Sequence, residues 1–340
     1  MSAVSLVILA TVVAFSVTVA LGFAVIPWLH RLKFGQTILS IGPAWHKKKQ
    51  GTPTMGGILF AAGIAAAVVV ALATDALTGG DILVGDYPVP LEMRTKVISG
   101  LLMALSFGII GFADDYIKVV RKRNLGLSVA QKTAAQFLVM LAYLWSLYLS
   151  MNGKPYMYIP FVGNVELGFF FWIFGFAVLY ATVNAVNFTD GVDGLCSSVT
   201  LTTAVALSVI AAMRRLFGVS VVAAALAGGC GGFLVWNRHP AKVFMGDTGS
   251  MFLGGMVVAV AYAVGCPLIL LPVGIVYVVE GLSDVMQIVW FKLTHGKRLF
   301  KMAPIHHHFE LCGWSEKKIV CVFTLVNLIG CGVGVFCMKC

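Results

Sequence analysis

Long apolar runs recur along almost the whole chain and decide what it can fold into. A helix needs about 20 predominantly apolar residues to cross a bilayer. Runs of that kind lie roughly at 3–28, 55–78, 96–113, 132–151, 168–186, 196–213, 218–236, 248–265, 267–290 and 319–338. With 59% hydrophobic and 11% charged residues, a water-soluble domain could not hide this much apolar surface. The sequence therefore predicts an all-α, polytopic integral membrane protein with about ten transmembrane helices in a single domain over residues 1–340.

The ninth run is the least regular of these predicted spans. Only residues 265–267 separate it from the eighth, and it carries Pro272, Glu280 and Asp284. Because the two acidic residues lie one helical turn apart, we expect them to form a polar stripe and to help bend or break the helix near the membrane interface. No chemical role follows for either of them from the sequence. An apolar groove beside this helix is a hypothesis for the path of a lipid.

The positions of the basic residues predict how the chain is oriented. If the predicted spans alternate across the membrane, 18 of the 24 Lys and Arg residues lie on the same side as the 29–54 loop. Cytoplasmic loops carry such an excess, so this side is predicted to be cytoplasmic and both termini periplasmic. The pair Arg214 and Arg215 is an exception that falls outside. The net charge of +10 does not indicate nucleic-acid binding, because the basic residues lie in short loops.

The same alternation brings five aspartates to cytoplasmic helix ends. They are Asp114 and Asp115 in GFADDYIK, Asp190 and Asp193 in NFTDGVDG, and Asp247 in FMGDTGS. A carboxylate is costly in hydrocarbon, so carboxylates near a membrane usually line a polar cavity and bind something. Carboxylates beside glycine-rich turns are what Mg²⁺ and a diphosphate substrate would need. The sequence therefore predicts a site at the cytoplasmic face.

The first motif pairs adjacent carboxylates with a lysine. Asp114 and Asp115 repel each other and favour a cation beside them. Lys118 follows at i+4 and i+3 and can pair with either. A solvated helix end with a charged loop is the alternative interpretation. In an enzyme, one aspartate would serve as metal ligand or base, and the lysine would contact a phosphate.

The second motif repeats a polar residue every third position. If the helix continues, Asn187, Asp190 and Asp193 share one face. Gly191 and Gly194 allow a ligand to approach the backbone closely. The alternative is that Asp193 simply caps the next helix, which would explain one aspartate and leave the repeat unexplained.

The third motif, residues 244–250, precedes a predicted helix. Asp247 or Thr248 could cap that helix. In the functional interpretation, Asp247 binds Mg²⁺ while the helix N-terminus faces a phosphate. Phe244 offers a ring on which a base could stack.

Histidines and lysines complete the set. His306, His307 and His308 lie inside MAPIHHHFELCGW, without the Cys or Glu spacing of a zinc site, and we expect contacts with a phosphate or leaving group. The segment HKKKQGTPTMGG, residues 46–57, joins three lysines to a Gly/Pro-rich turn. It is either ordinary positive-inside charge that attracts lipid headgroups or a contact for an anionic substrate.

Together these motifs resemble one enzyme family. The segments GTPTMGG (51–57), FADDYIK (112–118), NAVNFTDGVDGL (184–195), VFMGDTGS (243–250) and APIHHHFEL (303–311) occur in its order and spacing. The chain resembles the phospho-N-acetylmuramoyl-pentapeptide transferases, within the polyprenyl-phosphate N-acetylhexosamine-1-phosphate transferases. The resemblance covers essentially all 340 residues.

The resemblance implies a reaction and a site. The family transfers phospho-MurNAc-pentapeptide from UDP-MurNAc-pentapeptide to undecaprenyl phosphate with Mg²⁺, giving lipid I and UMP, the first membrane step of peptidoglycan synthesis. It has ten helices in the bacterial cytoplasmic membrane, often as a homodimer, with the active site facing the cytoplasm. The resemblance implies catalytic roles for Asp114, Asp115, Asp247 and His306, with Asp247 as metal ligand. It implies substrate-binding roles for Lys49, Lys118, Lys132, Asn187, Asp190, Asp193, Phe244, His307 and His308.

Alternatives stay open at this point. A related transferase that uses UDP-N-acetylglucosamine with the same acceptor has a different histidine pattern. A secondary transporter for an anionic metabolite would predict inverted repeats and broken helices at the midplane, whereas these carboxylates gather at one face. The sequence decides neither which aspartate acts as base nor whether a phosphoryl-aspartate forms.

Overall fold

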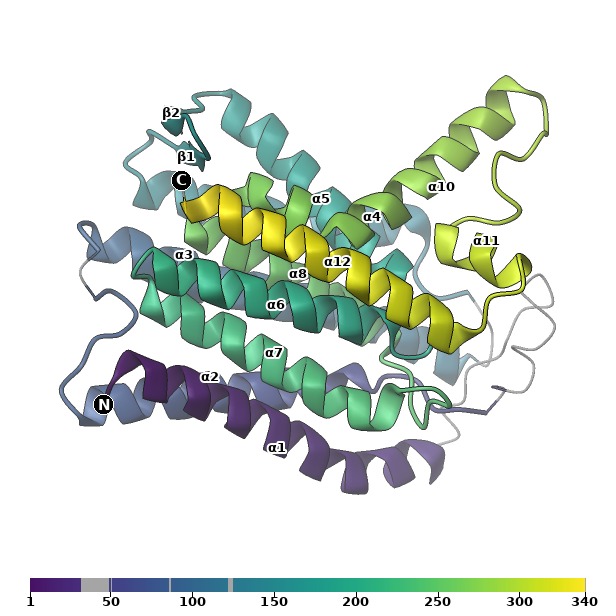
Figure 1. Ribbon diagram of the computed structural model, residues 1–340, viewed down its shortest axis with the longest axis horizontal. Helices are drawn as coiled ribbons and strands as arrows, with labels where there is room; N and C mark the ends of the chain where they lie inside the picture. The colour runs from purple at the N-terminus through teal and green to yellow at the C-terminus, as the bar shows by residue number, and fades with distance from the viewer. Residues whose placement is uncertain (32–48, 50, 86, 122–124, 340) are drawn as a thin grey trace.

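Helices build almost the whole protein (Figure 1). The computed structural model describes residues 1–31, 49, 51–85, 87–121 and 125–339. Among these residues, nine helices are long and apolar enough to cross a membrane. They are α1 (Ala3–Arg31), α2 (Gly57–Leu77), α3 (Pro90–Val120), α4 (Val129–Ser150), α5 (Phe170–Thr189), α6 (Leu195–Met213), α7 (Phe217–Asn237), α8 (Gly246–Val264) and α12 (Glu316–Lys339). The prediction of an all-α, many-span membrane protein is confirmed.

The ninth predicted span is broken rather than continuous. It consists of the 3₁₀ helix η2 (Pro267–Ile269), α9 (Leu270–Val273) and α10 (Ile275–Leu293), and the two parts meet at 89°. Pro272 cannot donate a backbone hydrogen bond, and Gly274 follows it at the break. The break therefore lies upstream of Glu280 and Asp284, which do not cause it. In Figure 1, α10 stands away from the bundle.

Small residues bring the central helices close together. Of the most apolar 18 residues of α8, 94% are buried, compared with 22% for α1, so α8 is the axis of the bundle. A Cβ added at Gly255 would meet Ala104 of α3, and one at Gly254 would meet Val183 of α5. Such contacts replace the hydrophobic driving force that is missing between helices in lipid. The glycines of α8 thus fix α3 and α5 beside its axis.

Two elements escaped prediction because both are short. The hairpin of β1 (Tyr156–Ile159) and β2 (Gly163–Glu166) joins α4 to α5, with Met157 opposite Val165. Helix α11 (Ile305–Leu311) contains the three histidines. The hairpin lies at one end of the bundle and α11 at the other, and both chain ends lie at the hairpin end (Figure 1).

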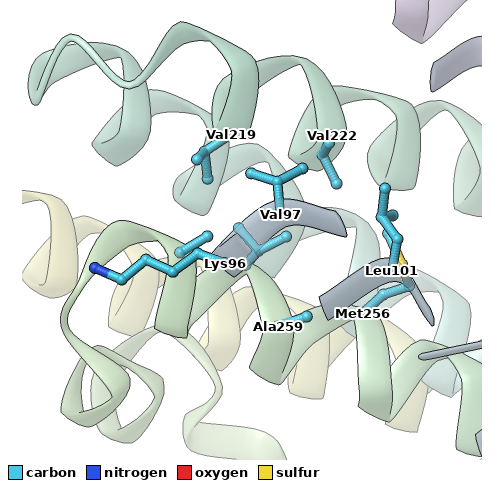
Figure 2. A pocket seen from close by; sticks show the side chains of 9 residues that line it. Lys96, Val97, Leu101, Val219, Val222, Met256 and Ala259 are labelled. Atoms are coloured by element: carbon cyan, nitrogen blue, oxygen red, sulfur yellow. The ribbon is translucent and has the colours of Figure 1, made fainter. Parts of the chain in front are cut away.

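A small internal cavity lies between α3, α7 and α8 (Figure 2). It measures about 10 Å³ and is lined by apolar side chains and by Lys96. The ammonium nitrogen of Lys96 lies 2.6 Å from Oε1 of the buried Glu92. A cavity of this size holds about one water molecule, so it is not a substrate site.

Candidate active site

Three carboxylates meet where helices converge at the end opposite the hairpin. Asp114 and Asp115 come from the C-terminal part of α3, and Asp247 comes from the first turn of α8. Each offers an oxygen, and these oxygens lie within 4.8 Å of one another. Asp114 and Asp115 are buried, whereas the side chain of Asp247 keeps 21% of its surface exposed. Of the three carboxylates, Asp247 is therefore the most accessible.

Two glycines make this approach possible. A Cβ at Gly111 would overlap the backbone carbonyl of Asp247, so only glycine lets α3 pass so close to the start of α8. Gly246 has a φ of +68°, in the left-handed region that favours glycine. A side chain at Gly246 would also overlap the carboxylate of Asp115. The cluster of three carboxylates thus depends on close backbone contacts that a side chain at Gly111 or Gly246 would prevent.

Two lysines and an amide surround Asp247. The ammonium nitrogens of Lys118 and Lys132 lie 3.0 and 2.9 Å from its Oδ2. Lys118 also lies 2.5 Å from Oδ2 of Asp114. The side-chain amide of Asn187 donates to Oδ1 of Asp247 at 3.0 Å. Side chains from α3, α4 and α5 therefore converge on one carboxylate of α8.

The two adjacent aspartates are held by different partners. Oδ2 of Asp115 accepts hydrogen bonds from the backbone N–H of Thr248 at 2.9 Å and from its hydroxyl at 2.7 Å. Oδ1 of Asp114 accepts one from the backbone N–H of Leu127 at 2.7 Å. The start of α8 thus fixes Asp115, while Asp114 reaches the segment that enters α4.

The charges of this group suit a divalent cation and a phosphate. The three carboxylates face two lysines, which leaves one negative charge uncompensated. Carboxylate oxygens are the ligands that hard divalent cations prefer. Ammonium groups that already contact Asp247 are placed to contact phosphate oxygens as well. The residues present therefore fit a metal-bound phosphate compound.

A second group of charged side chains surrounds Asp193. Lys49 places its ammonium nitrogen 2.7 Å from Oδ1 of Asp193 and 2.6 Å from Oε2 of Glu316. Oδ2 of Asp193 lies 3.1 Å from Nδ1 of His239 and accepts the backbone N–H of Ala241 at 3.0 Å. Asp193 does not cap α6, because the N-cap position is Gly194 and no side chain bonds there. The lysines expected before Lys49, in residues 46–48, lie outside the described residues.

The aspartate turn, residues 190–194, links the two groups. The prediction that Asn187, Asp190 and Asp193 share one helical face is wrong. Helix α5 ends at Thr189, and Gly194 adopts a φ of +81°. Burial raises the pKa of Asp190, and the negative charges of Asp247, Asp115 and Asp193 raise it further. Asn187, just before this turn, contacts Asp247, and Asp193 within it pairs with Lys49, so the turn connects the two groups.

The three histidines point to different partners. Nδ1 of His306 lies 3.0 Å from Oε2 of Glu280, and its ring lies against Gly191, where an added Cβ would overlap Nε2. His307 lies 2.6 Å from Glu310, measured from Nδ1 to Oε2. Nδ1 of His308 accepts the backbone N–H of Lys301 at 3.1 Å. His306 is therefore the histidine that the fold packs against the aspartate turn.

Phe244 joins two of the sequence motifs through its backbone. Its N–H donates to the carbonyl of Pro53 at 2.8 Å, and its own carbonyl accepts the N–H of Gly56 at 2.8 Å. These bonds attach the 51–57 turn to the entry of α8. The ring of Phe244 is half-buried. That a base stacks on this ring stays a prediction.

Some residues of the site carried no usable signal in the sequence. Glu316 opens α12 and looks like an ordinary charge at a helix start. His239 is an isolated histidine between α7 and α8. Glu280 did stand out as an acid within an apolar run, but its partner is 26 residues away. Only the fold brings these side chains to the motifs.

A many-span membrane bundle that gathers acidic and lysine side chains at one end defines the class of integral membrane transferases that act on phosphorylated substrates. Comparison with known proteins agrees with this class. Residues 97–265 match the model of glycosyl transferase family 4, and residues 49–60 match signature 1 of the phospho-N-acetylmuramoyl-pentapeptide-transferases. The chain belongs to the phospho-N-acetylmuramoyl-pentapeptide-transferase family, as its motifs predict.

Curated relatives that carry this family name match the chain over nearly its whole length. The chain is 46% identical to the Desulforamulus reducens protein over 334 residues, covering 95% of each chain. It is 44% identical to the Desulforudis audaxviator protein over 346 residues, covering 98% of each. It is 42% identical to the Bacillus thuringiensis protein over 329 residues, covering 95% of each.

Proposed function

We propose that the protein transfers phospho-MurNAc-pentapeptide from UDP-MurNAc-pentapeptide to undecaprenyl phosphate, forming lipid I and UMP. One observation carries the proposal. Carboxylates from α3 and α8 lie within 4.8 Å of one another beside Lys118 and Lys132, in a chain that matches curated transferases over nearly its whole length. The match of residues 49–60 to the muramoyl-pentapeptide signature favours this donor over UDP-N-acetylglucosamine.

We propose Mg²⁺ as the cofactor of the cluster formed by Asp114, Asp115 and Asp247. Asp247 would hold it, with Asp114 and Asp115 beside it, and the bound cation would neutralise charge on the diphosphate of the donor. The three carboxylates outnumber the two lysines by one charge, and the side chain of Asp247 is partly exposed. Both features support this assignment. Lys118 and Lys132 would contact the phosphate oxygens.

The residues around the reacting phosphate act mainly by placement. An oxygen of the lipid phosphate attacks the sugar-proximal phosphorus, the bond from that phosphorus to the UMP oxygen breaks, and UMP leaves. Such a displacement needs the attacking and leaving oxygens in line more than it needs covalent help. Asp115, fixed by Thr248, and Asp114, fixed by Leu127 and Lys118, are the groups that we propose to orient the acceptor.

The second group would receive the nucleotide part of the donor. Lys49 and Asp193 lie at its centre, Asp190 joins it to the carboxylates, and Asn187 contacts Asp247 directly. Phe244 would stack on the base. We propose that His306 contacts phosphate and that His307 and His308 face the sugar-peptide portion, in keeping with their place on α11.

We further propose that this site faces the cytoplasm of a bacterium, within one transmembrane domain that spans the chain. Support comes from the excess of Lys and Arg in the loops at this end. Both chain ends lie at the opposite end of the bundle, so the termini would be periplasmic (Figure 1). The resemblance also predicts a homodimer, which the mass of the detergent-solubilised protein would test.

The release of UMP tests the function directly. Purified protein with Mg²⁺ and undecaprenyl phosphate should release UMP from UDP-MurNAc-pentapeptide, and omission of the lipid should prevent it. UDP-N-acetylglucosamine serves as the matched donor and should not substitute. The reverse preference would establish the related transferase instead. Chelation of the metal should stop the reaction, and Mg²⁺ added in excess should restore it.

A further inference from the structure

A buried acid and a buried histidine form a pair between α10 and α11. Nδ1 of His306 lies 3.0 Å from Oε2 of Glu280, and both side chains are completely buried. Glu280 lies near the start of α10, the helix of the broken ninth span whose far end stands away from the bundle (Figure 1). The pair therefore joins this projecting helix to the short helix that carries the histidines.

Each member of the pair also has a polar atom left over. Within the described part of the chain, Nε2 of His306 and Oε1 of Glu280 are buried without a hydrogen-bond partner. A buried polar atom without a partner costs about 1–3 kcal/mol, so native proteins rarely keep one without a use. We therefore look for a ligand of the unpartnered Nε2 of His306.

The direction of that nitrogen is set by the aspartate turn. A Cβ at Gly191 would overlap Nε2 of His306, so the ring edge lies directly against the backbone of this turn. Gly191 belongs to the same turn as Asp193, whose carboxylate lies 2.7 Å from the ammonium nitrogen of Lys49. Nε2 thus lies at the edge of the polar site.

We propose that Glu280 is the positioning residue of His306. An ionised carboxylate only accepts hydrogen bonds, so the proton of the pair lies on Nδ1 of the imidazole. This fixes the ring with Nε2 toward the site and stabilises the positive charge when Nε2 is protonated too. The ligand of Nε2 is a phosphate oxygen of the substrate. The inference rests on the proposed function, because the phosphate belongs to that reaction.

Other charged groups near the pair are consistent with this assignment. Asp284 lies one turn after Glu280 and its negative charge also acts on His306. The ring of His307 lies 4.1 Å from that of His306, measured between centroids. Nδ1 of His307 lies 2.6 Å from Oε2 of Glu310.

A double-mutant cycle separates positioning from simple support of the fold. Glu280→Gln keeps the shape and removes the charge, and it should lower UMP release by about 10–100-fold, the range known for carboxylates behind metal-bound histidines. His306→Gln should lower it at least as much. If Glu280 acts through His306, adding Glu280→Gln to His306→Gln causes no further loss. Losses that multiply would overturn the proposal.

The state of the ring gives a second measurement that does not depend on turnover. The chain has seven histidines, so ¹⁵N labelling of histidine gives few signals, and His306→Gln assigns one of them. In the wild-type protein His306 should carry a proton on Nδ1, and in Glu280→Gln that signal should shift. A wild-type ring protonated only on Nε2, or one that ignores the substitution, would refute the pairing.

Controls distinguish this inference from the function on which it rests. Glu92→Gln also removes a buried carboxylate, but at the hairpin end, and should leave UMP release per folded protein unchanged. An equal loss per folded protein in Glu92→Gln would show that the effect is not specific to the partner of His306 and would overturn the proposal. If wild-type protein releases no UMP, the proposed function fails, while the ¹⁵N spectra still decide whether Glu280 holds the Nδ1 proton.

Discussion

The ammonium nitrogen of Lys49 lies 2.7 Å from Oδ1 of Asp193, although the two residues are 144 positions apart in the chain. The same nitrogen lies 2.6 Å from Oε2 of Glu316 at the start of α12. One cation thus connects the segment before the 51–57 turn, the aspartate turn and the last helix. Lys49 thus joins three separate segments of the described chain, at the place that we propose for the nucleotide part of the donor.

Replacement of Lys49 by methionine should weaken donor binding. It would leave the carboxylates of Asp193 and Glu316 together without their shared cation and would remove a charged donor from the site. Since hydrogen bonds to charged groups contribute about 1.5–3 kcal/mol, we expect the KM for the UDP donor to rise about 10–100-fold, with a smaller change in kcat. Steady-state kinetics of UMP release measure both constants.

The matched control is Lys154→Met, an exposed lysine at the hairpin end. It removes the same charge from the chain and should leave both constants unchanged. An unaltered KM in Lys49→Met would show that the second group does not receive the donor.

Asp247→Asn should remove turnover while the protein still folds. The amide keeps the size of the side chain but cannot provide the charged oxygen that Lys118 and Lys132 both approach. Loss of the proposed metal ligand and of this pairing should reduce UMP release more than about 100-fold, the scale of a lost transition-state contact. A melting curve in detergent verifies folding, and near-normal activity would contradict the metal assignment.

Particular residues show how far the sequence could predict this structure. The spans were predictable because hydropathy and length are local properties. Pro272 also marked the ninth span as the least regular one. The continued helix through Asp190 was wrong, because the three-residue spacing does not report where Gly194 turns the backbone. The pairs Lys49 with Glu316 and Glu280 with His306 depend on which helices lie side by side, and no local pattern encodes that.

Gly111→Ala should destabilise the protein through the contact of α3 with α8. The added methyl group would overlap the backbone carbonyl of Asp247, and backbone yields less easily than a side chain. Overpacking of this kind costs about 1–3 kcal/mol of folding free energy, so the melting temperature should fall and activity with it. Gly332→Ala in α12 is the control, because nothing lies within 4 Å of its added Cβ. Equal melting temperatures for both variants would show that the close contact is not needed.

The side of the membrane that holds the site can be read from a natural cysteine. Cys312 is exposed just after α11, with its sulfur 3.7 Å from Nε2 of His308. If the site faces the cytoplasm, a membrane-impermeant maleimide should label Cys312 in inside-out vesicles and fail to label it in intact cells, because the reagent cannot cross the bilayer. Because Cys321 is exposed as well, the label is located by peptide mass, and Cys312→Ser should remove it from the peptide that contains residue 312. In the Cys312→Ser background, Lys154→Cys at the hairpin end should show the opposite pattern. Labelling of Cys312 from outside would reverse the orientation and separate the site from a cytoplasmic nucleotide donor.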